Sequence, residues 1–137
     1  MKVKISRRAT FNAAHRLHNK NWSEEKNKLF FGKCNNPHYH GHNYTLIVSV
    51  LGDINEDSGY VIDISYLKKI IEDKIIDYLD HKNLNLEVVE FQELNPTLEN
   101  IIKVIYDKLR KELSNEFTLS IILYETENNF AEINETV

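Results

Sequence analysis

The sequence predicts an α+β domain in which two helices cover one face of a mainly antiparallel sheet. Two long segments in the first 51 residues alternate apolar and polar side chains, two central segments carry apolar residues at helical spacing, and two strand-like runs follow near the C-terminus. Helices grouped between pairs of strands are typical of α+β folds. The chain has 137 residues, 42% of them hydrophobic, so we expect residues 1–137 to form a single domain.

The first predicted strand covers about residues 2–17. One parity of this segment is apolar, and it holds Val3, Ile5, Ala9, Phe11, Ala13 and Leu17. His15 shares that parity, which places its imidazole on the inward face of the strand. The polar and aromatic stretch 21–32 is then expected to form a loop or an irregular helical turn.

A second strand is predicted from about residue 39 to residue 51. Thr45 and Ser49 lie on its outward parity. Its inward parity holds His40, His42, Tyr44, Leu46, Val48 and Val50. The strand therefore presents two histidines to the same side as its apolar residues.

Two amphipathic helices follow. Asp63 is suited to cap the first, and Thr97 to cap the second, because both residue types accept hydrogen bonds from free N–H groups of a first helical turn. The apolar positions of the first helix are Ile64, Leu67, Ile70, Ile71, Ile75, Tyr78 and Leu79. Those of the second are Leu98, Ile101, Ile102, Ile105 and Leu109.

The chain ends with two predicted strands, at 117–125 and 130–135, and a short additional strand is suggested at 60–62. Glu125 continues the inward parity of the first of these, so an ionisable group would end an apolar face. A carboxylate there needs a partner, and a ligand with two N–H donors is suitable. The alternative is that the strand ends earlier and Glu125 reaches water.

Bulk properties exclude several classes of function. The net charge of -4 offers no basic field for a phosphate backbone, which disfavours nucleic acid as a partner. No apolar run approaches the roughly 20 residues needed to span a bilayer, and no signal core is seen at the N-terminus, so we expect a cytoplasmic protein without membrane contact. The single cysteine, Cys34, is either a small buried residue or a reactive or ligating thiol.

The stretch "HGH" indicates a metal site. Residues i and i+2 of a strand point the same way about 6.5–7 Å apart, so His40 and His42 could bind one ion. An H-x-H pair alone is common without metal, but His15 could supply a third nitrogen from the neighbouring strand. Three imidazoles with an open fourth position are typical of catalytic zinc. His18, on the outward parity, and His38, in the loop before the strand, are not expected to take part.

Two other patterns bear on function. Asp80 lies beside His81, and such a carboxylate can orient the imidazole and raise its basicity for proton transfer, although adjacent Asp-His pairs are also ordinary surface features. A cupin would also use H-x-H, but it would carry a glutamate four or five residues later, where this chain has Leu46 and Ile47.

Six motifs in order resemble those of the 6-pyruvoyltetrahydropterin synthases and of the related 6-carboxytetrahydropterin synthases of queuosine biosynthesis. They are "FNAAHRL", "FGKCNNP", "HGHNY", "LDHKNLN", "NPTLEN" and "YETENN", and they run from about Arg8 to Asn129. The resemblance implies a tunnelling fold (T-fold) with a four-stranded antiparallel sheet and two helices on one face. It also implies a homohexamer, a dimer of trimers, and 7,8-dihydroneopterin triphosphate as the substrate.

The resemblance further implies roles for individual residues. The zinc ligands would be His15, His40 and His42, and Cys34 would be the base. Asp80 and His81 would form a proton relay, and Glu125 would anchor the pterin, with Thr97 and Glu99 nearby.

Two products are compatible with this site. A pyruvoyl enzyme eliminates triphosphate and rearranges the side chain, whereas a carboxy enzyme also releases acetaldehyde. "CNNP" and "LDHKNLN" are closer to the former and "NPT" to the latter. Leu98 replaces a threonine typical of the pyruvoyl enzymes, and His38 and Tyr39 replace Asn-Gly. A non-catalytic metal-binding or pterin-binding module is the third alternative, and it would not need Cys34, Asp80 and His81 together.

Overall fold

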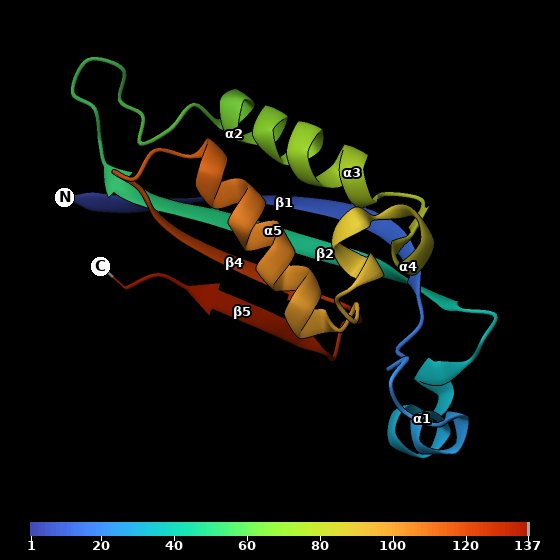
Figure 1. The fold of residues 1–137 in the computed structure, drawn as a ribbon. Coiled ribbons are helices and arrows are strands. Elements are labelled where there is room, and N and C mark those ends of the chain that lie inside the picture. Colours follow the sequence, from blue (N-terminus) through green and yellow to red (C-terminus); the bar gives the residue numbers. More distant parts are fainter. Residues whose placement is uncertain (137) are drawn as a thin grey trace.

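The computed structural model describes residues 1–136, which form a five-stranded sheet with its main helices on one face (Figure 1). The strand order is β3-β1-β2-β4-β5, antiparallel throughout except for the parallel pair β3 and β1. The strands are β1 (Lys2–His15), β2 (His40–Asp53), β3 (Lys82–Asn83), β4 (Thr118–Tyr124) and β5 (Phe130–Asn134). Four of them match the predicted strands, and the two-residue β3 adds a fifth.

The two main helical segments lie between β2 and β4, as expected. α2, a π-helical turn and α3 run as one continuous helix after the N-cap Asp63, and α5 follows the N-cap Thr97. In Figure 1 this continuous helix and α5 lie over the same face of the sheet. No described helix is long and apolar enough to cross a membrane. The bounds are α2 (Ile64–Ile71), the π-turn (Glu72–Ile76), α3 (Asp77–Leu79), α4 (Leu84–Glu87), a 3-10 turn (Val89–Gln92) and α5 (Leu98–Glu112).

The core lies between this helical layer and the inward parity of the sheet. The even-numbered residues of β2 from Tyr44 to Val50 and the odd-numbered residues of β4 are buried against the helices. One expectation was wrong, since residues 60–62 form no strand in the described chain. Ile64, an apolar position of the first predicted helix, is 51% exposed because the buried stripe of that helix begins one turn later, at Leu67.

Residues 21–32, expected as a loop or irregular turn, contain a regular helix, α1 (Glu24–Phe31). Ser23 caps it by accepting from the N–H of Lys26, and Gly32 ends it with a φ of 59°. The fully buried Asn27 ties the preceding loop to the helix, since its amide accepts from Asn19 N–H and donates to the carbonyls of Asn19 and Ser23. Because the residue that anchors α1, Asn27, is polar, a pattern of apolar residues could not predict this helix.

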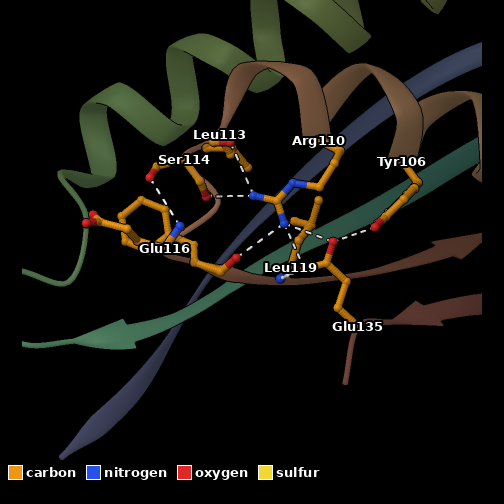
Figure 2. Close-up of polar contacts among 8 residues, drawn as sticks. Tyr106, Arg110, Leu113, Ser114, Glu116, Leu119 and Glu135 are labelled. Atoms are coloured by element: carbon orange, nitrogen blue, oxygen red, sulfur yellow. Dashed lines mark hydrogen bonds and ion pairs between the residues drawn. The ribbon is translucent and has the colours of Figure 1, made fainter. Parts of the chain in front are cut away.

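A polar cluster fastens the C-terminal segment to α5 and β4 (Figure 2). Arg110 Nη1 lies 2.7 and 2.9 Å from the two carboxylate oxygens of Glu135, which also accepts from Tyr106 Oη and, at 2.8 Å, from Leu119 N–H. Arg110 donates as well to the carbonyl of Ser114 at 2.6 Å. The Arg110 and Glu135 side chains are only 21% and 22% exposed. Burial alone would raise the pKa of Glu135, but these donors outweigh it and hold the pKa below its ordinary value.

Replacing Glu135 by glutamine is expected to lower the free energy of unfolding at pH 7 by about 2 kcal/mol, because charge-assisted hydrogen bonds in a partly buried site are lost. The native pKa of Glu135 lies below its unfolded value near 4.5, so its contribution is complete above that pH and disappears as the pH falls through the native pKa. Urea unfolding from pH 7 to pH 3 should therefore show the two curves converging in acid. Glu132→Gln, on an exposed position of β5, is the matched control and should change little. A constant difference at every pH would contradict this assignment.

Candidate metal centre

Three imidazoles meet at one end of the β1–β2 ladder. His15 pairs with His40 across the strands, and Ala13 pairs with His42, so the register brings all three histidines to the same end of the inward face. One ring nitrogen from each lies within 4.8 Å of the others, and the ring centroids are 4.6 to 5.1 Å apart. Among the described residues, the side chains of His15, His40 and His42 form the group that could hold a metal ion. We refer to these three histidines as the trio.

His15 is prepared as a neutral ligand. It is 1% exposed, and its Nδ1 lies 2.8 Å from the carbonyl oxygen of Pro96. Because a carbonyl only accepts, Nδ1 carries the proton and Nε2 keeps its lone pair. Burial lowers the pKa of His15 to about 4, helped by His40 and His42 and opposed by the Pro96 carbonyl. The imidazole is thus uncharged at neutral pH, as metal binding requires.

Two of these imidazoles carry buried nitrogen atoms that no group in residues 1–136 satisfies, His15 Nε2 and His40 Nδ1. Burial, and then the nearby His42, lower the pKa of His40 as well. Buried polar atoms normally have a partner. Orphaned nitrogens on neutral, converging imidazoles fit a zinc-type ion, for which three protein nitrogens and an open position are typical.

Glu125 adjoins this centre. It directly follows β4, and its N–H donates to the carbonyl of Asn129 in the turn that leads to β5. Its carboxylate oxygens lie 4.0 Å from His15 Nε2 and 3.8 Å from His42 Nε2, and the side chain is 21% exposed. The carboxylate therefore lies beside two of the three imidazoles.

A surface cavity of about 670 Å³ opens beside these residues. His42 and Glu125 line it together with Arg8, Thr45 and Tyr124. It is large enough for a bicyclic heterocycle with a side chain. A small molecule in this cavity could therefore reach His42 and Glu125, whereas His15 is buried behind them at 1% exposure.

Asp80 and His81 form a pair at the edge of the sheet, beside β3. Asp80 Oδ1 accepts from the N–H of Asn12 at 2.8 Å, and Asp80 Oδ2 lies 3.0 Å from His81 Nδ1. The Asn12 N–H and His81 hold the pKa of Asp80 below its ordinary value. His81 has a positive φ of 60° and an 81% exposed side chain. Its N–H donates to the Asn12 carbonyl, so strand contacts hold this uncommon backbone conformation in place.

The structure does not bring all the predicted site residues into contact. Cys34 lies half-buried in a 3-10 turn (Gly32–Asn35), and no hydrogen bond or ion pair within residues 1–136 joins it to Asp80 or His81. Thr97 Oγ1 caps α5 by accepting from Asn100 N–H, and Glu99 is exposed in the first turn of that helix.

The two histidines that were not expected to bind metal lie outside the trio. His18 Nδ1 is 2.9 Å from the amide nitrogen of Asn35, and His38 is exposed. Sequence reasoning missed the Pro96 carbonyl, a backbone acceptor 81 residues from His15 that leaves no side-chain signal. Tyr44 was placed on the inward parity of its strand, but no functional role was predicted for it.

Comparison with known proteins agrees with this geometry. The family model described as "6-pyruvoyl tetrahydropterin synthase" matches residues 4–136. The "6-pyruvoyl tetrahydrobiopterin synthase" of Homo sapiens is 44% identical over 127 residues, covering 93% of this chain and 88% of that protein. The "6-carboxy-5,6,7,8-tetrahydropterin synthase" of Rickettsia conorii is 28% identical over 149 residues, covering 96% and 99%.

A solved structure of Caenorhabditis elegans 6-pyruvoyl tetrahydropterin synthase superimposes with a TM-score of 0.92 at 36% identity, covering 99% of this chain and 97% of that one. The expected α+β tunnelling fold is therefore confirmed, with five strands in place of four.

Proposed function

The chain belongs to the 6-pyruvoyl tetrahydropterin synthase family, a family of lyases, and on this basis we propose that it is a zinc-dependent enzyme converting 7,8-dihydroneopterin triphosphate to 6-pyruvoyltetrahydropterin. The observation that carries the proposal is the convergence of three imidazoles beside the Glu125 carboxylate, next to an open cavity that His42 and Glu125 line. We propose residues 1–137 as one catalytic domain, and a cytoplasmic location stays a prediction.

His15, His40 and His42 would hold the metal, since one ring nitrogen of each converges with the others, and two of the three imidazoles carry a buried nitrogen without a partner in the described chain. When bound, zinc would acidify the C–H and O–H groups next to the substrate hydroxyls that it chelates. Pro96 would keep His15 in the required tautomer. Glu125 would bind the pterin by accepting hydrogen bonds from its amino group and ring N–H, with Thr97 and Glu99 on the adjacent segment.

Cys34 would be the base that removes a proton from the substrate side chain, as a thiolate. His81 would pass protons, and Asp80, itself held by Asn12, would orient its ring. The described residues make no bond between Cys34 and this pair, and His81 is 81% exposed. We therefore propose that the relay is completed between subunits of a homohexamer, a dimer of trimers.

The alternative product is 6-carboxytetrahydropterin, formed with release of acetaldehyde. The "NPT" segment favours it, and Pro96 of that segment contacts His15. The higher identity to a pyruvoyl relative, 44% against 28%, favours the pyruvoyl product.

Incubation of the zinc-loaded protein with 7,8-dihydroneopterin triphosphate is expected to release triphosphate without acetaldehyde. Triphosphate is measured by ion chromatography and acetaldehyde by a coupled dehydrogenase assay, with metal-free protein as the control. Acetaldehyde in equal amount to triphosphate would replace the pyruvoyl assignment by the carboxy one. Zinc binding without any turnover would favour a non-catalytic pterin-binding module.

A further inference from the structure

Tyr44 is a fully buried tyrosine whose hydroxyl finds no hydrogen-bond partner among residues 1–136. Its ring stacks on Phe11 of the neighbouring strand, with centroids 4.9 Å apart and planes 9° from parallel. A phenylalanine would make the same stacking contact. Because a buried hydroxyl without a partner is unfavourable, the packing of the core does not account for a tyrosine at this position.

The tyrosine lies at the back of the metal centre. It follows His42 by two residues on the same face of β2, and its ring centroid is 5.7 Å from that of His42 and 6.4 Å from that of His15. Thr45 pairs with Tyr124 at the end of the antiparallel β2–β4 ladder. Continuing this register by one residue places Tyr44 opposite Glu125. A tyrosine hydroxyl is protonated at neutral pH and able to donate a hydrogen bond.

The Glu125 carboxylate has unused acceptor positions. No group in the described chain donates a hydrogen bond to its carboxylate, and its distances of 3.8 and 4.0 Å to the imidazole nitrogens exceed hydrogen-bonding range. A carboxylate has about four acceptor positions. One donor from the protein would still leave enough of them for the two N–H groups of a pterin.

We infer that Tyr44 is a positioning residue for Glu125, donating a hydrogen bond to one carboxylate oxygen once the imidazoles hold metal and the carboxylate turns from them to receive a ligand. The inference rests on the proposed function, since the ligand is taken to present an amino group and a ring N–H. The hydrogen bond sets the plane of the carboxylate, so both N–H donors meet it in the right direction.

The test is Tyr44→Phe in zinc-loaded protein, with neopterin as a fluorescent probe of pterin binding. We expect the Kd for neopterin to rise about tenfold, as for the loss of one charge-assisted hydrogen bond. KM for 7,8-dihydroneopterin triphosphate should rise more than kcat falls. Zinc affinity should stay within about twofold, and the melting temperature of the metal-free protein should be unchanged or higher, because an unpaired buried hydroxyl has been removed. Tyr66→Phe, the same change at an exposed residue of α2, is the matched control.

A double-mutant cycle separates positioning from direct contact. In the Glu125→Gln background, Tyr44→Phe should weaken neopterin binding by less than about twofold, because its effect passes through the carboxylate. An equal loss in both backgrounds, wild-type affinity in Tyr44→Phe, or a lower melting temperature would each overturn the inference. If the wild-type protein itself does not bind neopterin, the proposed function fails together with the inference.

Discussion

Replacing His42 by alanine is expected to weaken zinc binding at least 100-fold, with loss of turnover. Two remaining imidazoles cannot complete the three-nitrogen set of a catalytic zinc site. His40→Ala should behave in the same way. Metal content after dialysis, together with competition against a chromogenic chelator, measures the effect.

His38→Ala is the matched control for this prediction, because His38 lies in the loop just before the same strand and outside the trio. It should retain one zinc per chain. Unchanged metal content in the His42 and His40 variants would refute the ligand assignment. A loss of zinc in His38→Ala would show that the loop contributes a ligand.

Cys34→Ala is expected to keep its zinc and lose turnover by about 100- to 10,000-fold, the usual effect of removing a general base. Cys34 lies outside the histidine trio, which predicts that metal binding does not depend on it. Steady-state kinetics and metal analysis on the same preparation measure the two effects separately.

Cys34→Ser is the companion variant, since it keeps the size of the side chain but replaces the thiol by a much weaker acid. It should be nearly as inactive as Cys34→Ala. Full activity in either variant would remove the thiolate from the mechanism, and loss of zinc in both would instead make Cys34 a metal ligand.

The sequence alone predicted the main elements and the shared face of the three histidines. Alternation along β1 and β2 identified the inward faces, and Asp63 and Thr97 do cap the helices. The same period-2 rule put His15, His40 and His42 on one face. The parity of each strand and each helix cap depends on residues within a few positions of each other, so local patterns predict them, whereas the pairing of His15 with His40 depends on strand register.

The tertiary structure decided what depends on contacts between distant segments. It added β3 and α1, and left Cys34 unbonded to Asp80 and His81 in the described chain. It also set the Pro96 carbonyl against His15 and placed Glu125 beside the imidazoles. A strand period shows which way a side chain points but not which atom it meets. Strand register, loop closure and hydrogen bonds between distant segments determine those partners, and they exist only once the chain has folded.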